Sequence, residues 1–247
     1  MWSVGCSRPV LPADDRPNVA RRLAWAAHIY TASGGFIALV AAAAMLEDRY
    51  RDAFAWMAVT VLIDATDGWL ARLLKVKERT PGFDGELLDN IVDYVTYVFV
   101  PALAVVRARI VPEPWAMPIA GAMLVASAIG FSRAGAKTAD YFFTGFPSYW
   151  NIVVFYLFAF GWTQTANAVV LVALIALVFV PIGYVYPSRT PTLRRLTVAL
   201  GAAWGTLVLA MIARVPDVPR PWLWMSMVFP VYYVALSLVL HARRNRG

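Results

Sequence analysis

Four aspartates stand in otherwise apolar stretches of the sequence, at spacings that bring side chains together on helices. Asp64 and Asp67 are three residues apart, and Asp89 and Asp93 are four apart. On an α-helix both spacings place the two side chains on one face. Ionisable groups inside a membrane span are costly and usually functional, so these carboxylates are the first candidates for chemistry.

Small and basic residues share the predicted faces with the aspartates. Gly68, Ala71 and Arg72 follow on the first face, and Gly85 stands one turn before Asp89 on the second. Glycine and alanine let a backbone or a phosphate group approach closely, and a guanidinium binds phosphate oxygens through paired N–H groups. The pattern therefore predicts a phosphate-binding surface beside the carboxylates.

The two pairs of aspartates match in depth if their helices are antiparallel. Counted inward at the helical rise from the shared helix ends, Asp67 and Asp89 lie roughly 6–8 Å deep. Asp64 and Asp93 lie at about 12 Å. We therefore predict one cluster of four carboxylates where the two faces meet.

Four carboxylates in one cluster must be partly protonated or neutralised by cations. The donors are all oxygen, with no Cys or His at a useful spacing, which favours Mg²⁺ or Mn²⁺ over zinc. A cation site with a neighbouring arginine suits phosphate chemistry. A proton or cation pathway, or structural pairing of the aspartates with Arg72, would use the same residues and stays open.

The helices that carry these residues must lie in a membrane. Of the 247 residues, 60% are hydrophobic and 15% are charged, with a mean hydropathy of +0.61. A soluble domain would have about a quarter of its residues charged. Long continuous apolar runs indicate helices, because barrel strands would alternate. The net charge of +7 is spread over helix ends, which favours a membrane surface over nucleic acid as the partner.

We predict an all-α polytopic membrane protein with about eight transmembrane helices and an active site at the cytoplasmic side, between helices two and three. The spans run at about 23–46, 52–74, 86–108, 115–132, 147–163, 165–186, 193–213 and 221–242. Sixteen basic residues lie on the side of both termini and six on the other, which makes both termini cytoplasmic by the positive-inside rule. A cytoplasmic arm (1–22) and a basic tail (243–247) flank one transmembrane catalytic domain (23–242).

The aspartate motif resembles the signature of the CDP-alcohol phosphotransferases. The residues that carry the resemblance are Asp64-Ala-Thr-Asp67-Gly68-Trp-Leu-Ala71-Arg72, followed by Gly85, Asp89 and Asp93. The spacer between the two parts, Leu73–Asp84, has twelve residues, which is longer than usual in that family and similar to the bacterial phosphatidylcholine synthases. A second segment, Lys137–Asn151, and the run Tyr184–Ser188 are similar to the same subfamily.

The resemblance implies an enzyme of a bacterial inner membrane that transfers the phosphatidyl group of CDP-diacylglycerol to choline and releases CMP. It implies that four carboxylates hold divalent cations: Asp64, Asp67, Asp89 and Asp93. Asp93 is expected to take the proton of the choline hydroxyl. The positions expected to contact the nucleotide phosphates are Gly68, Ala71, Arg72 and Gly85. Membrane lipid and a second copy of the chain, as a homodimer, are the further partners that the resemblance implies.

Other acceptors, such as serine, glycerol 3-phosphate or inositol phosphate, would keep the same enzyme class. A phosphorylated acceptor calls for additional basic residues, and the segment 133–151 offers only Arg133 and Lys137. A cation transporter is the alternative from another class. It would use the aspartates without needing the small residues and the arginine beside them, which phosphate recognition explains.

A choline acceptor calls for aromatic side chains, because its quaternary ammonium has no N–H to donate and is held by aromatic faces and negative charge. We predict contacts to Trp150 and Tyr186, each beside a cytoplasmic loop, and to Tyr97, on the third helix. Packing, or a place in the aromatic belt of the membrane interface, is the alternative for each. His28 and Thr31 on the first helix are candidates for the nucleotide pocket or for packing between helices.

Overall fold

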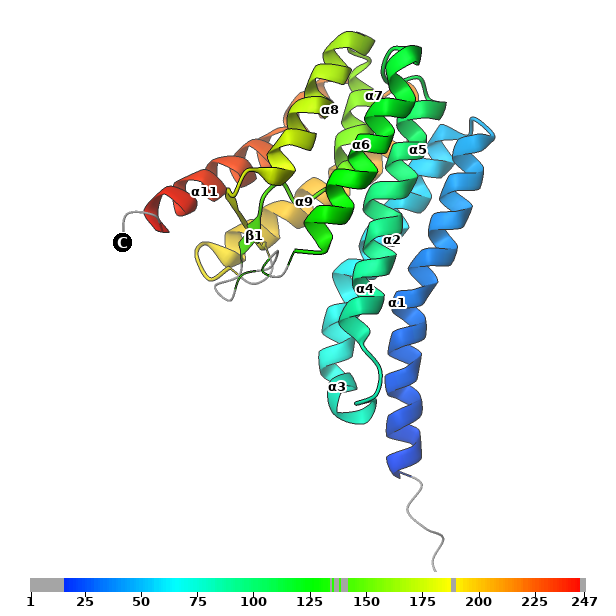
Figure 1. Ribbon diagram of the computed structural model, residues 1–247, viewed down its shortest axis with the longest axis vertical. Helices are drawn as coiled ribbons and strands as arrows, with labels where there is room; N and C mark the ends of the chain where they lie inside the picture. The colour runs from blue at the N-terminus through cyan, green and yellow to red at the C-terminus, as the bar shows by residue number, and fades with distance from the viewer. Residues whose placement is uncertain (1–15, 134, 136–137, 139–141, 188–189, 245–247) are drawn as a thin grey trace, which may run out of the picture.

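The computed structural model describes residues 16–133, 135, 138, 142–187 and 190–244, and within these ranges the chain is mostly helical (Figure 1). The first two helices, α1 (Arg16–Leu46) and α2 (Tyr50–Leu73), pack side by side, and the later helices extend the bundle from them. Most of the predicted N-terminal arm, the last three residues of the tail and Lys137 lie outside the described residues.

The remaining helical segments follow the predicted order. They are α3 (Val76–Arg79), α4 (Gly85–Asp93), the π-helical turn η1 (Tyr94–Phe99), α5 (Val100–Arg107), α6 (Glu113–Phe131), α7 (Trp150–Phe160), α8 (Gln164–Phe179), α9 (Arg194–Ile212), α10 (Arg220–Ser226) and α11 (Val228–Arg244). The segments α4, η1 and α5 form one continuous helix, Gly85–Arg107, which corresponds to the third predicted span.

Six helices in the described part of the chain are long and apolar enough to cross a membrane. The helices α7, with 11 residues, and α8, with 16, rise only about 16 Å and 24 Å, against a hydrocarbon core of roughly 30 Å. A glycine in the left-handed conformation, Gly161, ends α7, and Pro181 forces Val180 into an extended conformation that ends α8. The protein is therefore a helical polytopic membrane protein, and the predicted number of eight spans stays a prediction.

Two short strands add to the predicted all-helical fold. β1 (Phe142–Thr144) and β2 (Gly183–Val185) pair antiparallel and join the segment before α7 to the segment after α8. The backbone N–H of Val185 donates to the Ser237 hydroxyl at 3.1 Å, which ties this small sheet to α11. Strands of three residues show no alternation long enough to identify from sequence.

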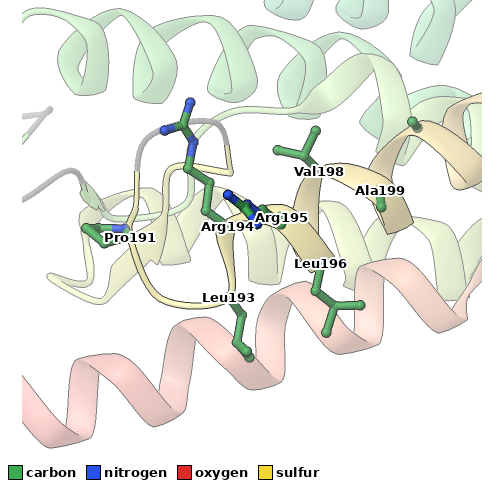
Figure 2. Close-up of a pocket in the computed structure, with 8 residues that line it drawn as sticks. Pro191, Leu193, Arg194, Arg195, Leu196, Val198 and Ala199 are labelled. Atoms are coloured by element: carbon green, nitrogen blue, oxygen red, sulfur yellow. The ribbon is translucent and has the colours of Figure 1, made fainter.

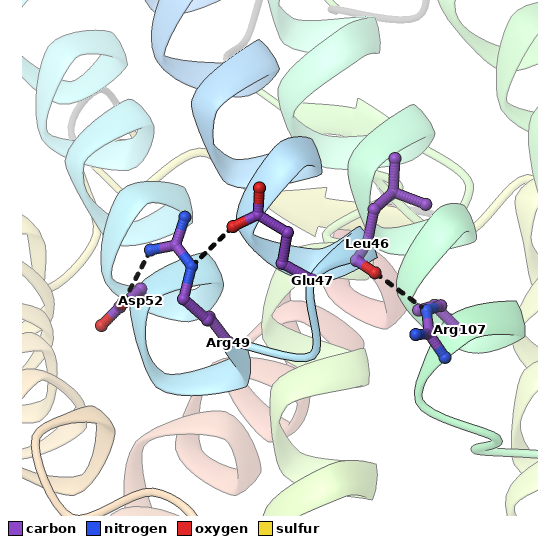
Figure 3. A network of polar contacts seen from close by, with 5 residues as sticks. All are labelled: Leu46, Glu47, Arg49, Asp52 and Arg107. Atoms are coloured by element: carbon purple, nitrogen blue, oxygen red, sulfur yellow. Dashed lines mark hydrogen bonds and ion pairs between the residues drawn. The ribbon is translucent and has the colours of Figure 1, made fainter.

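The turn between α1 and α2 carries an exposed network of charges (Figure 3). Arg49 donates to Glu47 at 2.8 Å and to Asp52 at 2.9 Å. Arg107, at the end of α5, donates to the carbonyl of Leu46 at 3.2 Å. Exposed ion pairs contribute little stability. They mark the polar end of these helices, which is the opposite end of α2 from the one that leads into α3 and α4.

Candidate active site

Three of the four predicted aspartates meet between two helices. Asp64 of α2 and Asp89 and Asp93 of α4 each offer a carboxylate oxygen, and these oxygens lie within 4.8 Å of one another. All three side chains are half-buried. The antiparallel arrangement expected from the two motifs therefore brings carboxylates from both helices to one place.

The start of α4 is defined by an N-cap that sets where its aspartates project. The side chain of Asp84 accepts hydrogen bonds from the backbone N–H groups of Glu86 at 3.1 Å and Leu87 at 2.9 Å. These bonds satisfy two donors that the first turn of a helix otherwise leaves free. Asp89 and Asp93 then follow on one face, one turn apart.

Asp67 lies outside the group of three. Its side chain is buried, with 7% of its surface exposed, and its Oδ2 accepts a hydrogen bond from the Thr31 hydroxyl of α1 at 2.8 Å. Asp67 follows Asp64 by three residues on α2. Its side chain therefore projects about 60° around the helix from that of Asp64, toward α1. The predicted cluster of four is thus three aspartates plus one bonded to α1, and metal ligation by Asp67 stays a prediction.

The first helix is the third wall of the site. A Cβ added at Gly34 would lie 2.8 Å from Cγ1 of Val92, so α1 and α4 approach too closely for any larger residue there. His28, four residues after the buried Ala24, is itself buried and lies 3.0 Å from the Thr80 hydroxyl through Nε2. His28 and Gly34 are visible in the sequence as a polar and a small residue on the first helix. The sequence does not show that they contact Thr80 and Val92.

The small residues and the arginine of the motif have definite neighbours. A Cβ at Gly68 would lie 3.4 Å from Nη1 of Arg72, so the guanidinium folds back over the glycine. Ala71 packs against a small buried cluster where α3 meets α1. A Cβ at Gly85 would lie 2.8 Å from Cε1 of His28. Packing thus restricts side-chain size at Gly85, and the nucleotide contacts of Gly68, Ala71, Arg72 and Gly85 stay predictions.

Tyr97 bonds directly to one aspartate of the group. Tyr97 is buried, and its hydroxyl donates to Oδ2 of Asp64 at 2.7 Å. It belongs to η1, the π-helical turn that begins immediately after Asp93. Such wide turns occur mostly as short insertions at functional sites, and a hydrogen bond of this kind orients a carboxylate that binds a metal.

Three further tyrosines continue from Tyr97, and we refer to the four as the tyrosine row: Tyr97, Tyr149, Tyr233 and Tyr184. Their ring centroids are separated in this order by 6.1, 6.4 and 6.4 Å. The Tyr233 hydroxyl donates to the backbone carbonyl of Val185, in β2, at 3.0 Å. The members come from η1, the turn before α7, α11 and β2, so the row leads from the carboxylates to the small sheet.

The predicted choline contacts Trp150 and Tyr186 occupy different surroundings. Trp150 is fully buried, and its ring N–H donates to the Ser127 hydroxyl at 2.8 Å. Tyr186 is half-buried, and its ring lies 4.8 Å from that of Phe143. The roles of both in choline binding stay predictions.

The turn before α7 explains why Tyr149, rather than its neighbour, belongs to the row. Ser148 has φ +56°, an uncommon conformation for a residue other than glycine, and its hydroxyl lies 2.9 Å from that of Ser127. Ser127 therefore holds both Ser148 and the ring of Trp150, and the turn between them presents Tyr149. Tyr149 and Tyr233 are not among the predicted choline contacts, because their neighbours come from distant segments of the chain.

A separate groove of about 1060 Å³ lies at the start of α9 and contains none of the motif residues. It is lined by Pro191, Leu193, Arg194, Arg195, Leu196, Val198, Ala199 and Ala202. Figure 2 shows Arg194 pointing away from Leu193 and Leu196. Charged and apolar side chains on opposite sides of a helix end are typical of the membrane interface.

The donor set between α2 and α4 fits a hard divalent cation. Carboxylate oxygens are the ligands that Mg²⁺ and Mn²⁺ prefer, and three of them converge here. Like charges so close together disfavour one another, and a cation relieves that cost. Among the described residues, this is the one group of three or more Asp, Glu, His or Cys side chains close enough to hold a metal ion.

Comparisons with known proteins identify relatives of this chain. No protein-family model matches the chain. It is 38% identical to the phosphatidylcholine synthase of Rhizobium johnstonii over 225 residues. This aligned region covers 91% of this chain and 93% of the relative. The chain is 42% identical over 184 residues to that of Agrobacterium fabrum (74% and 76%) and 38% over 221 residues to that of Legionella pneumophila (87% of each).

The chain belongs to the phosphatidylcholine synthase family. A match over 225 of its residues necessarily includes the aspartate motif, the long spacer and the second segment, which all lie well inside the chain. The resemblance to the bacterial phosphatidylcholine synthases is therefore confirmed, and with it the class of phosphatidyltransferase.

Proposed function

We propose that this protein transfers the phosphatidyl group of CDP-diacylglycerol to choline and releases CMP. The observation that carries the proposal is the convergence of Asp64, Asp89 and Asp93, from two helices, in a chain related to phosphatidylcholine synthases over most of its length. Arg72, folded over Gly68 on α2, supplies a guanidinium for the phosphates of the nucleotide.

Asp64, Asp89 and Asp93 would hold the cation, Mg²⁺ or Mn²⁺, with Asp67 as a further ligand. When bound, the cation supplies positive charge that favours a pyrophosphate in this site and CMP as the leaving group. Thr31 and Tyr97 keep two of the carboxylates oriented through hydrogen bonds of 2.8 and 2.7 Å. These bonds preorganise the site before the lipid arrives.

Asp93 is the residue we propose as the general base. Its carboxylate takes the proton of the choline hydroxyl as the oxygen attacks the phosphorus of the phosphatidyl group. The bond from that phosphorus to CMP breaks in the same exchange, so no covalent intermediate with the protein is needed. Asp93 suits this role because the tyrosine row begins at η1, directly after it in the chain.

The tyrosine row supports choline as the acceptor. Aromatic faces attract a quaternary ammonium, most strongly where water is excluded. Tyr97 is buried, and Tyr149 and Tyr233 are half-buried beside it. We propose that choline lies between the carboxylates and these rings, with Tyr186 and Trp150 as the further predicted contacts. A free amine such as serine would instead seek hydrogen-bond acceptors for its N–H groups.

The arginines favour a cytoplasmic site in a bacterial inner membrane. Arg194 and Arg195 stand at the start of α9, and Arg243 and Arg244 stand at the end of α11. Clusters of this kind lie on the cytoplasmic side. We propose that both termini and the active site face the cytoplasm. We also propose that the protein forms a homodimer, and light scattering of the purified protein in detergent would test this oligomeric state.

One assay tests the proposed function. Purified protein is incubated with CDP-diacylglycerol, Mn²⁺ and labelled choline, and both CMP and the labelled lipid are measured. We expect CMP release that depends on choline and stops on chelation of the metal. Release driven instead by serine, glycerol 3-phosphate or inositol phosphate would overturn the acceptor. Cation flux in vesicles without CMP release would overturn the enzyme class.

A further inference from the structure

The spacer between the two parts of the motif, Leu73–Asp84, is packed onto α1. It contains α3, whose Val76 is buried against Ala24 and Ala27. Lys75 enters α3 in the left-handed conformation, with φ +48°, which turns the chain back toward α1. The extra length of this spacer therefore forms a contact surface for the first helix.

A hydrogen bond fixes the second half of the spacer to the same helix. The buried Thr80 hydroxyl lies 3.0 Å from Nε2 of His28 and donates its proton to the Val76 carbonyl at 2.9 Å. Both contacts use the same Thr80 oxygen, which links the imidazole of α1 to the first turn of α3. A ring nitrogen of α1 thus holds the end of α3 in place.

Aromatic contacts hold Phe83, two residues before the start of α4. The ring of Phe83 lies 4.3 Å from that of His28 and 5.1 Å from that of Trp25. Trp25 and His28 are themselves 5.6 Å apart, one turn of α1 from each other. Such pairs add stabilisation beyond the area they bury, so Phe83 is seated on α1 by two rings at once.

The first residue of α4 touches the same imidazole. A Cβ on Gly85 would lie 2.8 Å from Cε1 and 3.3 Å from Nδ1 of His28. Only glycine fits here without moving the ring or the helix. His28 therefore contacts Thr80, Phe83 and Gly85 in succession, and α4 continues from Gly85 without a break to Asp93.

We infer that His28 is a positioning residue for the active site, which fastens the spacer to α1 and sets where α4 presents Asp89 and Asp93. This inference rests on the proposed function for its catalytic consequence. A helix is stiff along its axis, so a shift at Gly85 moves both carboxylates relative to Asp64. Small misplacements of catalytic groups have large effects on rate. Glycine at position 85 is required, on this view, by the imidazole that packs against it.

A double-mutant cycle between His28 and Gly85 tests the contact without any reaction. The Tm of four proteins is measured in detergent: the native chain, Gly85→Ala, His28→Ala and the double variant. We expect Gly85→Ala to lower the Tm in the native background and to have little effect in the His28→Ala background, where the space has been opened. Additive effects would overturn the contact and the inference with it.

The same four proteins test the consequence for the site. We expect His28→Ala to lower kcat by about 100-fold with little change in the choline KM, and to reduce the rise in Tm that Mn²⁺ produces. The double variant should be about tenfold more active than Gly85→Ala alone. If Gly85 serves only to contact phosphate, removing the imidazole would restore nothing, and the positioning role would be wrong.

A matched control comes from the same helix. Tyr30 hydrogen bonds to Thr66 of α2 at 2.8 Å, so Tyr30→Phe removes a bond of similar length between neighbouring helices without touching the spacer. We expect its kcat and its response to Mn²⁺ to equal those of the native chain. If the native chain made no phosphatidylcholine, the proposed function would fail, whereas the cycle in Tm would still decide the His28 contact.

Discussion

The two sides of the active site differ in how the chain assembles them. The carboxylate side consists of α1, α2, the spacer and α4, which follow one another in the sequence. The tyrosine side takes one residue each from η1, the turn before α7, β2 and α11. One side is local and the other is built from segments far apart in the chain.

The packing of the two sides differs as well. On the carboxylate side glycines let backbones and rings approach closely, as at Gly34 and Gly85, where an added Cβ would lie 2.8 Å from a neighbour. On the tyrosine side, rings 6.1–6.4 Å apart fill the space. We therefore expect substitutions on the carboxylate side to abolish turnover or metal binding, and substitutions on the tyrosine side to produce graded changes in choline affinity.

The largest expected effect is that of Asp93→Asn, on the carboxylate side. Loss of a general base should lower kcat by about 1000-fold, while CDP-diacylglycerol still binds. CMP release gives the rate, and the rise in Tm on adding CDP-diacylglycerol gives the binding. Asp52→Asn is the matched control, because Asp52 stands on α2 at its far, exposed end, paired with Arg49 at 2.9 Å (Figure 3). A near-normal rate in Asp93→Asn would remove it from the role of base.

Tyr97 belongs to both sides, so two substitutions at this position separate the effect of its hydroxyl on the metal site from the effect of its ring on choline. Tyr97→Phe keeps the ring and removes the hydroxyl that bonds to Asp64, so the Mn²⁺ concentration needed for half-maximal rate should rise by about 10–100-fold. The choline KM should hardly change. Tyr97→Leu also removes the ring and should raise both values. Equal metal requirements in Tyr97→Phe and the native chain would place Tyr97 on the tyrosine side alone.

Tyr149→Leu should raise the choline KM by about tenfold, because an aromatic face beside a desolvated cation contributes about 1–2 kcal/mol. The metal requirement should stay unchanged, and Tyr149→Phe should keep most of the choline affinity. Tyr156→Phe, on α7, is the control, since its hydroxyl bonds to Ser226 and Trp204, at 2.8 and 2.9 Å, and not to the row. A choline KM unaltered by Tyr149→Leu would mean that choline binds elsewhere.

The smallest expected effect is that of Ser127→Ala, because Ser127 contacts the two neighbours of Tyr149 and not the tyrosine row itself. The substitution removes the partner of both the Trp150 ring N–H and the Ser148 hydroxyl, and a buried donor left without a partner costs about 1–3 kcal/mol. The Tm should fall, and the choline KM should rise by about two- to threefold as the turn that presents Tyr149 loosens. A change in the Mn²⁺ requirement instead would show that the two sides are not separate.

The carboxylate side was largely predictable from the sequence, whereas most of the tyrosine side was not. Asp64, Asp89 and Asp93 were predicted to meet because helical periodicity and a short connection leave two adjacent helices few ways to pack. The predicted position of Asp67 was less accurate. Its bond to Thr31 depends on α1, whereas the prediction compared depths only on the two helices that carry the aspartates. Tyr149 and Tyr233 were not selected, since no local pattern records which of many aromatic residues meet.

The sequence by itself determined the membrane class, the helical architecture and the motif that gathers the carboxylates, because hydrophobicity and helical periodicity act within short stretches of chain. The tertiary structure alone decided that α1 closes the site, that His28 limits position 85 to glycine, and that a turn held by Ser127 presents Tyr149. Such contacts join residues many positions apart, and they are selected by the packing of whole helices rather than by any pattern along the chain.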